Sequence, residues 1–376
     1  MKIGTGKIKA LWATSALVCL MSAAGFSQSA IPQPAPTIGD PAKPERPSRR
    51  AAAETPVLDL REPAALPSNH WKFRFKQTPV PTGGGGTYEK SIAVDPKINL
   101  SLCVTQGDVK VNGWSRNEVR VFIKDGSKLG FDVVQTARQG NKPVWIKVVG
   151  SDPEKPSAAT ECIWGSSVEL DVPEGASVDL EGKSTASIVD SIRKIKVKNV
   201  GGNISIRNVT EGVFAATYEG NVDVENSDGS ISLESASGNI VVFESGPSQV
   251  GDTFRAKTNG GTISLQNIEH RQVDVSSITG TILVNTELMT AGIYNFNTSN
   301  GSIVFGVPSV PPCYLLATYG FGRFDSELPV KIDTENITPG PVKSIRGPFD
   351  NASKTDCKLN LTTSSGNIRI RKRTNP

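Results

Sequence analysis

Apolar and polar residues alternate along most of the chain from Tyr88 onward, and this period of two predicts β-strands. In the first part of this region the alternation predicts five strands, at residues 98–104, 109–111, 119–123, 144–148 and 168–172. Clusters of Gly, Asn, Asp and Pro separate them, as is typical of turns. Residues 186–198 show some helical spacing of apolar residues, but their Val and Ile fit a strand equally well. The pattern predicts an all-β chain.

From about residue 177 a five-residue phrase takes over: Gly, any residue, Ile or Val, any residue, and an apolar residue. Its nine copies begin at Gly107, Gly202, Gly220, Gly229, Gly238, Gly261, Gly280, Gly301 and Gly366. The seven copies from Gly202 to Gly301 are separated by 18, 9, 9, 23, 19 and 21 residues. A period of about 20 residues predicts stacked β-coils, which bury their apolar sides against each other. We therefore expect a β-solenoid, like a single-stranded β-helix, with roughly five coils between Asn199 and Val307.

The Ile or Val of each phrase holds a fixed place after the glycine. Because side chains alternate between the two faces of a strand, these residues should all point inward and stack as one aliphatic ladder. The predicted ladder consists of Ile204, Val222, Ile231, Ile240, Ile263, Ile282 and Ile303.

The N-terminus has the features of a secretory signal peptide. Lys2, Lys7 and Lys9 precede an uncharged apolar stretch, and the small residues Ser27 and Ser29 suit a cleavage site. The stretch is shorter than the ~20 residues that a spanning helix needs. We predict that residues 1–29 are removed, so that the mature chain has no transmembrane segment and is periplasmic, cell-surface or extracellular.

The mature chain is expected to have four parts. Residues 30–87 form a disordered linker, since 11 of the 25 prolines lie between residues 30 and 81; within it His70–Lys76 alternates aromatic and basic residues like a short edge strand or docking segment. Residues 88–176 form a β-rich region whose tryptophans predict a bulkier core. Residues 177–307 form the regular coils, and residues 308–376 form an insertion, a cap and a last strand at Gly366 with basic residues at the exposed end.

Charge argues against a nucleic-acid partner. Removing the first 29 residues removes three Lys and no acid, so the formal charge falls from +4 to +1. A nearly neutral chain lacks the positive field that binds phosphate backbones. The partner we expect is a surface protein or a polysaccharide.

Four cysteines remain after removal of the signal peptide, and an even number in an exported chain suggests two disulfides. Three pairings are possible. We favour Cys103–Cys162 with Cys313–Cys357, because each bridge then stays within one region of the chain. The wide spacing and the two histidines do not support a zinc site.

Candidate catalytic residues do not form a recognisable motif. Asp223, Glu225, Asp228 and Glu234 fall within about one coil and could act in a polysaccharide lyase, but a solvated outer face explains them as well. His270, between Glu269 and Arg271, is expected at an exposed turn. A cleft could also form at the insertion, which carries Tyr314, Tyr319, Phe321, Arg323, Asp325 and Glu327. We expect no enzymatic activity, cofactor or metal.

The repeated phrase, the segment Gly107–Val121 (GDVKVNGWSRNEVRV) and the closing segment Thr363–Ile370 (TSSGNIRI) resemble the bacterial putative-adhesin family. The resemblance covers residues 95–371 and implies an exported β-solenoid without known catalytic residues. The function it implies is adhesin-like binding of an envelope or surface partner through a polar repeat face. The alternatives are a carbohydrate-active β-helix enzyme, either a polysaccharide lyase or a hydrolase, and an accessory protein of envelope stress or signalling.

Overall fold

The structure is a computed structural model that describes residues 85–138, 140–150, 162–336, 342–349 and 356–373. These residues form two large β-sheets, A and B, and no helix. The predicted signal peptide, His70–Lys76 and the predicted linker up to residue 84 lie outside the described residues. No helix of the described part is long and apolar enough to cross a membrane.

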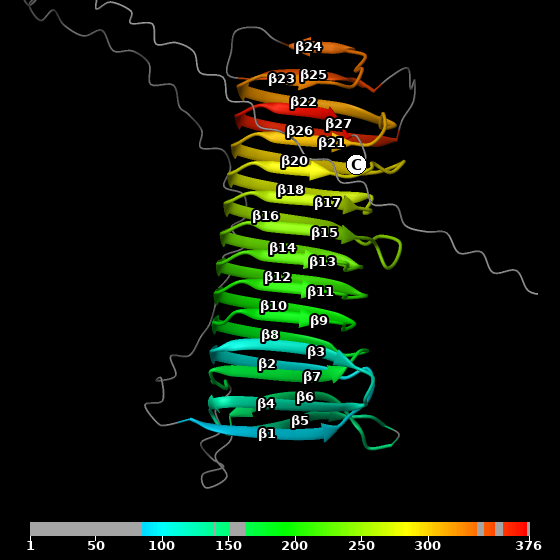
Figure 1. Ribbon diagram of the computed structural model, residues 1–376. Coiled ribbons are helices and arrows are strands. Elements are labelled where there is room, and N and C mark those ends of the chain that lie inside the picture. Colours follow the sequence, from blue (N-terminus) through cyan, green and yellow to red (C-terminus); the bar gives the residue numbers. More distant parts are fainter. Residues whose placement is uncertain (1–84, 139, 151–161, 337–341, 350–355, 374–376) are drawn as a thin grey trace, which may run out of the picture. The chain divides into compact units, whose positions relative to one another are not determined.

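Each sheet is a row of neighbouring strands (Figure 1). Sheet A has thirteen strands in the order β1 (Gly86–Ala93), β4 (Glu118–Gly126), β7 (Ser167–Pro173), β3 (Asp108–Trp114), β9 (Ser187–Asp190), β11 (Ile204–Arg207), β13 (Val222–Glu225), β15 (Ile240–Ser245), β17 (Ile263–Ile268), β19 (Ile282–Asn285), β21 (Ile303–Val307), β27 (Ile368–Lys372) and β23 (Phe324–Ser326). Sheet B has fourteen in the order β24 (Thr334–Asn336), β25 (Lys343–Pro348), β22 (Cys313–Phe321), β26 (Cys357–Ser365), β20 (Ile293–Asn300), β18 (Gln272–Thr279), β16 (Phe254–Gly260), β14 (Ser230–Ser237), β12 (Gly212–Glu219), β10 (Lys194–Gly201), β8 (Ser177–Ser184), β2 (Asn99–Gln106), β6 (Pro143–Gly150) and β5 (Leu129–Thr136).

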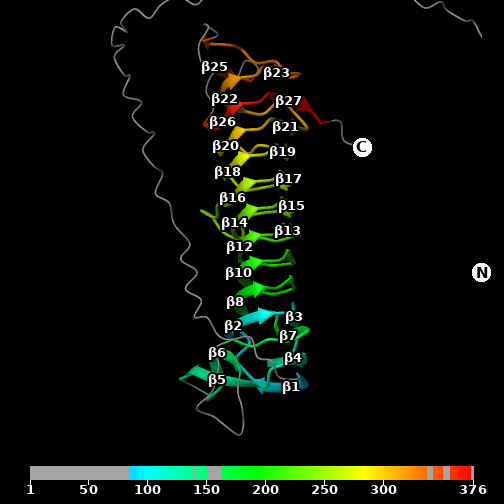
Figure 2. The same cartoon turned by 90° about the vertical axis from the view of Figure 1, so that its left-hand side faces the viewer.

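In the central part, every coil supplies one strand to each sheet. Five complete coils run from β12/β13 to β20/β21, and each strand pairs in parallel with the equivalent strand of the next coil. Figure 2 shows the two sheets facing each other, with β12 and β14 on one side and β13 and β15 on the other. The stacked all-β solenoid expected from the period of about 20 residues is thus confirmed.

Six of the seven predicted ladder residues form one column inside sheet A. They are 0% exposed, and the parallel pairing places them in direct succession: Ile204, Val222, Ile240, Ile263, Ile282 and Ile303. Equivalent strands in parallel register lie about 4.8 Å apart, so each side chain from Val222 to Ile303 packs on an aliphatic side chain above and below, whereas Ile204 has Ser187 on one side.

Ile231 is buried as well, but in sheet B, where its neighbours are Val213 and Phe254. The prediction of a single ladder through all seven residues was therefore wrong for Ile231. Its glycine, Gly229, precedes a strand of sheet B, whereas Gly220 and Gly238 precede strands of sheet A. The half-period of nine residues is the step from one sheet to the other.

Glycine holds the corner before each strand of sheet A from β11 to β21, because the stacked corners approach closely. At Gly261, φ is +139°, and a Cβ added there would lie 2.2 Å from the carbonyl oxygen of Gly238 in the previous coil. The same Gly238 oxygen accepts a hydrogen bond of 3.0 Å from Thr258 Oγ1, just before the corner. A side chain at the corner would thus collide with the backbone and disturb this partly buried hydrogen bond.

At the C-terminal end, strand order departs from sequence order. Strand β26 lies between β20 and β22, and β27 lies between β21 and β23. The prediction that the Gly366 copy forms the exposed last strand was wrong, because β23 and β24 occupy the edges. Gly322, followed by Arg323 and Phe324, stacks on Gly366 as a further corner glycine. This segment does not match the repeated phrase, because Phe324 replaces Ile or Val and Ser326 stands where the phrase has an apolar residue.

The N-terminal end shows a similar exchange of order. Strand β8 lies between β2 and β10, and β3 lies between β7 and β9. Strands β1 and β4 in sheet A and β5 and β6 in sheet B extend the stack with antiparallel pairs. The predicted bulky tryptophan core is wrong for the described tryptophans: Trp114 and Trp164 are half-buried, and Trp145 is 39% exposed.

Candidate binding groove

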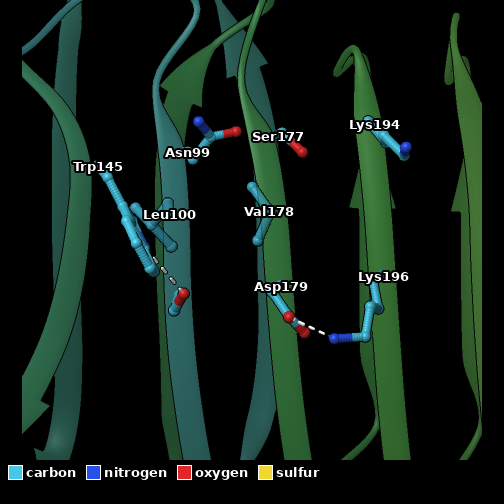
Figure 3. A pocket seen from close by; sticks show the side chains of 9 residues that line it. Asn99, Leu100, Trp145, Ser177, Val178, Asp179, Lys194 and Lys196 are labelled. Atoms are coloured by element: carbon cyan, nitrogen blue, oxygen red, sulfur yellow. Dashed lines mark hydrogen bonds and ion pairs between the residues drawn. The ribbon is translucent and has the colours of Figure 1, made fainter. Parts of the chain in front are cut away.

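An open groove of about 390 Å³ lies on the outer face of sheet B, over strands β6, β2, β8 and β10 (Figure 3). We call it the Trp145 groove. Its lining consists of Asn99, Leu100, Ser101, Trp145, Ser177, Val178, Asp179, Lys194 and Lys196. It lies where the antiparallel N-terminal strands meet the regular coils.

Strand register arranges the lining in two rows across the sheet. The first row is Trp145, Asn99, Ser177 and Lys194, each opposite the next on the adjacent strand. The second row contains Ser101, Asp179 and Lys196. Because adjacent strands lie about 4.8 Å apart, the first row runs roughly 14 Å from the indole to the lysine.

Alternation along β6 explains why the indole faces outward. Ile146 and Val148 are buried in the core, so Trp145 between Val144 and Ile146 must point to the opposite side. Its Nε1 donates a hydrogen bond of 3.5 Å to Ser101 Oγ on the adjacent strand. This contact holds one edge of the ring against the sheet and leaves 39% of the residue exposed (Figure 3).

The far side of the groove is charged. Lys196 Nζ forms an ion pair with Asp179, whereas the side chain of Lys194 forms no ion pair or hydrogen bond with any described residue. The Cε of Lys194 lies 3.9 Å from where a Cβ on Gly212 would be, so its stem leans toward the next strand, β12. The lining includes two lysines and one aspartate, and the groove therefore carries a formal charge of +1.

The four acids considered for catalysis do not meet. Asp223 and Glu225 lie on the outer side of β13 in sheet A, where Glu225 pairs with Arg207 Nε at 3.1 Å and burial raises the pKa of Asp223. Asp228 accepts a hydrogen bond of 3.0 Å from the backbone of Gly246 at a corner, and Glu234 lies on β14 of sheet B. This arrangement offers no paired acid and base.

His270 is the clearest departure from the sequence-based expectation. It was predicted at an exposed turn, but it is 0% exposed and its ring packs on Phe254 with centroids 5.7 Å apart. Its Nε2 lies 2.7 Å from the carbonyl oxygen of Gly229, so Nε2 carries the proton and Nδ1 is buried without a partner. Burial lowers the pKa of His270, although the Gly229 carbonyl and the nearby Asp252 oppose this effect.

Asp252, close to His270, holds together the loop that lengthens this coil to 23 residues. Burial alone would raise the pKa of Asp252, but hydrogen bonds from Ser230, Gln249 and Ser248 lower it below its ordinary value. The distances are 2.8 Å from Ser230 Oγ and 2.9 Å from the Gln249 amide. The hydrogen bonds of Asp252 and His270 thus stabilise this corner of the coil.

The residues singled out in the predicted insertion are dispersed along β22 and β23. Tyr319 is buried, whereas Tyr314 and Phe321 are 36% and 77% exposed. Asp325 lies opposite Arg369, and Glu327 accepts a 3.1 Å hydrogen bond from the Lys372 amide. The amide of Arg323 donates to Asn367 Oδ1 at 3.0 Å. Among the described residues, no group of His, Cys, Asp and Glu is placed to hold a metal ion.

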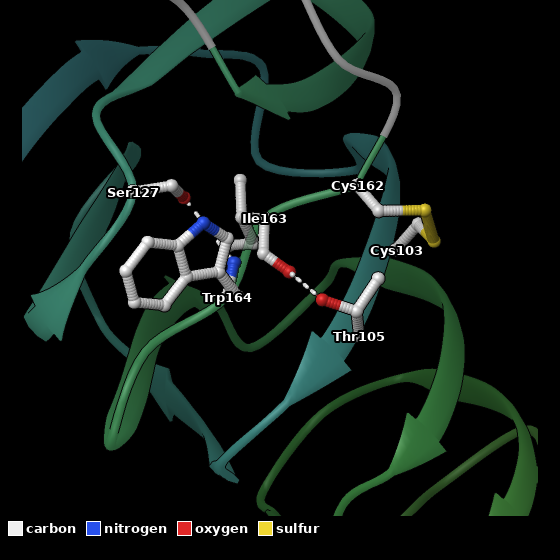
Figure 4. The surroundings of a disulfide bond; sticks show 6 residues. All are labelled: Cys103, Thr105, Ser127, Cys162, Ile163 and Trp164. Carbon is white, nitrogen blue, oxygen red and sulfur yellow. Dashed lines mark hydrogen bonds between the residues drawn. A yellow bond between two sulfur atoms is a disulfide. The ribbon is translucent and has the colours of Figure 1, made fainter. Parts of the chain in front are cut away.

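The four cysteines lie in two pairs, Cys103–Cys162 and Cys313–Cys357, with Cα–Cα distances of 4.5 and 4.4 Å. Figure 4 shows the first pair beside the hydrogen bond of 3.4 Å that Thr105 Oγ1 donates to the carbonyl oxygen of Ile163. The backbones of Val104 and Ile163 also form an isolated parallel β-bridge. In the second pair, Cys313 and Cys357 lie directly opposite each other on β22 and β26. Two disulfides indicate an extracytoplasmic protein.

The Trp145 groove was not foreseen in the sequence, although a signal was present. The pattern Val144, Ile146 and Val148 fixes the inward face of β6 and leaves Trp145 on the outer face. Its neighbours Asn99, Ser177 and Lys194 come from strands far apart in the sequence. They meet because β8 inserts between β2 and β10, which no local pattern reveals.

Comparison with known proteins agrees with this architecture. The chain matches the model of the family described as Toastrack DUF4097 over residues 157–375. No curated protein matches the chain. One solved structure is described as a putative cell adhesion protein from Clostridium sporogenes ATCC 15579. It is similar over 76% of this chain and 100% of that chain, with 10% identity and a TM-score of 0.21. A likeness this slight supports no conclusion about this chain. The family match covers more than half of the chain and confirms the adhesin-like family indicated by the sequence; the chain therefore belongs to the Toastrack DUF4097 family.

Proposed function

We propose that the protein is a non-enzymatic, exported, adhesin-like β-solenoid that binds an envelope or surface partner through the outer face of sheet B. The partner is a surface protein or a polysaccharide. The observation that carries the proposal is the Trp145 groove, which combines an exposed indole with hydroxyl, amide and ammonium groups on a rigid sheet. Few positioned polar groups around an apolar surface are the usual composition of a binding site.

The backbone supports this function by holding the outer side chains in register. Each strand of the central coils is hydrogen-bonded to a neighbour on both sides, and the aliphatic columns fill the space between the sheets. Side chains on such a support lose little freedom on binding, since their backbone is already ordered. Many weak polar contacts along the face can therefore add to the contact at the groove.

No observation favours a polysaccharide lyase or hydrolase. The acids that could serve such an enzyme lie on different faces of the two sheets, and Asp325 on β23 and Glu327 just after it lie beside β27. The residues of the groove are suited to donating and accepting hydrogen bonds and to contacting a ring, without an adjacent general acid and base.

We also propose that residues 1–29 direct export and that residues 30–85 act as a linker to the solenoid; the linker is two residues shorter than the sequence predicted, because β1 begins at Gly86. The two disulfides support export, because such bonds persist in oxidising compartments. N-terminal sequencing of the secreted chain should begin at Ala30. Recovery of the full-length chain in the cytoplasm would contradict this assignment.

The binding face can be tested by steric blocking. Ser232 on β14 and Ser205 on β11 are both half-buried, but they lie on the outer faces of sheets B and A respectively. Each is changed to Cys and coupled to a bulky polyethylene glycol maleimide, and binding of the labelled protein to isolated bacterial envelopes is measured. Polymer at position 232 should abolish binding and polymer at position 205 should not. Equal binding by both, or no binding by the unlabelled protein, would contradict the proposal.

A further inference from the structure

We propose that the Trp145 groove binds an acidic polysaccharide, a chain of sugar rings that carry carboxylates. This inference rests on the proposed surface-binding function and specifies its ligand. It is drawn from three features of the groove: an exposed indole at one end, a lysine without an ionic partner at the other, and uncharged polar side chains between them.

The indole supplies the contact for a sugar ring. One face of a pyranose consists of C–H groups, and these weakly positive hydrogens suit the negative face of an aromatic ring. Trp145 is 39% exposed on an outer face whose other groove residues are mostly polar. The hydrogen bond from Nε1 to Ser101 Oγ orients the ring, so little freedom is lost when a ligand stacks on it.

The middle of the groove supplies partners for hydroxyl groups. Asn99 and Ser177 lie opposite each other on β2 and β8, between Trp145 and Lys194. Their side chains form no hydrogen bond to any described residue, so amide and hydroxyl groups are available to a ligand. An amide and a hydroxyl can each donate and accept, which matches the mixed character of sugar hydroxyls.

The far end selects a negative charge. Asp179 is occupied by Lys196, and the exposed Lys194 has no ion pair among the described residues. The row from Trp145 to Lys194 spans roughly 14 Å, which leaves room for several linked sugar rings between the stacking position and the ammonium group. A neutral polymer would leave Lys194 without a partner. A nucleic acid would need a far larger positive field than the net +1 of the lining.

The test uses the mature full chain and two acidic polymers, polygalacturonate and alginate. Their neutral counterpart is fully methyl-esterified polygalacturonate, which has the same backbone without the charge. At least one acidic polymer should bind in a titration, and the methyl ester should bind about two to five times more weakly than polygalacturonate if that polymer is the ligand, as expected for the loss of one exposed ion pair. Binding should weaken as salt is raised, since the charged contact is exposed.

Three variants and one control locate the site. Trp145→Ala should weaken binding about tenfold, as expected for an aromatic anchor, and Trp145→Phe should restore part of the loss. Lys194→Gln should weaken it about two- to fivefold, in the range of an exposed ion pair, and reduce its salt dependence. Lys257→Gln, on β16 of the same face but outside the groove, should change nothing. Unchanged thermal unfolding shows that each variant is folded.

Three results would overturn this inference: no binding of either acidic polymer, equal binding of the methyl ester, or wild-type binding by both Trp145→Ala and Lys194→Gln. The proposed function is judged separately by binding to bacterial envelopes. If polymer at position 232 blocks that binding while Trp145→Ala and Lys194→Gln leave it unchanged, only the acidic-polysaccharide inference fails. If the protein binds neither envelopes nor acidic polymers, both fail.

Discussion

The stacked corners predict a sharp difference between two adjacent glycines, Gly260 and Gly261. At Gly261, φ is +139° and an added Cβ would lie 2.2 Å from Gly238 O and 2.6 Å from Gly238 C. At Gly260, φ lies outside the left-handed region, and the atom nearest an added Cβ is Thr279 Oγ1 at 3.7 Å, an ordinary contact. Changing each glycine to Ala therefore adds the same methyl group with very different consequences.

Two terms make up the cost of Gly261→Ala. The left-handed backbone costs a residue with a Cβ about 1–2 kcal/mol. The added methyl group would collide with the backbone of Gly238, and that corner is itself stacked on the next one. The clash can be removed only if the whole coil shifts. We expect this shift to cost about 1–3 kcal/mol, as in an overpacked core. We expect a total loss of about 2–5 kcal/mol in the free energy of unfolding. Gly260→Ala should change it by less than about 0.5 kcal/mol.

Gly251 separates the two terms. Its φ is +97°, but no heavy atom lies within 4 Å of an added Cβ. Gly251→Ala should therefore show the backbone cost alone, about 1–2 kcal/mol. The assay is urea unfolding followed by far-ultraviolet circular dichroism, with the three variants compared at equal m-values. If Gly261→Ala costs no more than Gly251→Ala, the close approach of the corners does not limit the side chain, and the reasoning is refuted.

Three further changes test the core, the buried histidine and the cysteines. Ile263→Asp should cost about 3 kcal/mol or more in the free energy of unfolding, because it buries a charge without a partner in the sheet A ladder. If Ile263→Asp costs less than Ile263→Val, residue 263 does not lie in a packed aliphatic column. Folding lowers the pKa of His270, so as the pH falls the unfolded chain binds a proton at this residue before the folded chain does. The contribution of His270 to the free energy of unfolding should therefore fall as the pH drops below about 6.5. In urea unfolding, the His270→Gln variant should lack this part of the pH dependence. Mass spectrometry of a non-reduced digest should join Cys103 to Cys162 and Cys313 to Cys357, and four free thiols would contradict both pairs.

The regular coils could be predicted because each position repeats the same physical demand. Ile240 and Ile263 occupy equivalent inward positions, and each follows a corner where only glycine fits. Ile231 shows the limit of this reasoning. The corner before β14 in sheet B also carries a glycine, Gly229, before an inward aliphatic residue, although Asp252 and Arg271 hold the equivalent positions before β16 and β18. The same phrase therefore occurs in both sheets, and only the strand pairing tells the copies apart.

The misplacements of Trp145 and His270 have different causes. Tryptophan was assigned to the core by residue type, although the alternation of β6 leaves it outside. His270 lies between two charged residues, a local pattern typical of an exposed turn. It is buried because the loop around Asp252 and the ring of Phe254 cover it, and Gly229, 41 residues earlier, supplies its acceptor. Contacts of this kind are absent from any local pattern.

The order of strands at the two ends also escapes the sequence, and it bears on stability. A central strand such as β16 has an equivalent neighbour on both sides, whereas coils near the ends lack this support, so local opening should begin there. The two disulfides lie where sequence order and spatial order differ: Cys313–Cys357 joins β22 to the intercalated β26, and Cys103–Cys162 attaches the segment before β7 to β2, beside the intercalated β8. Without the bond, β22 could separate from β26 before the central coils open. Reduction should therefore speed amide exchange at β22 and β26 before it affects β14–β18, as measured by hydrogen–deuterium exchange, whereas uniform acceleration along the stack would show that the bonds stabilise all coils alike.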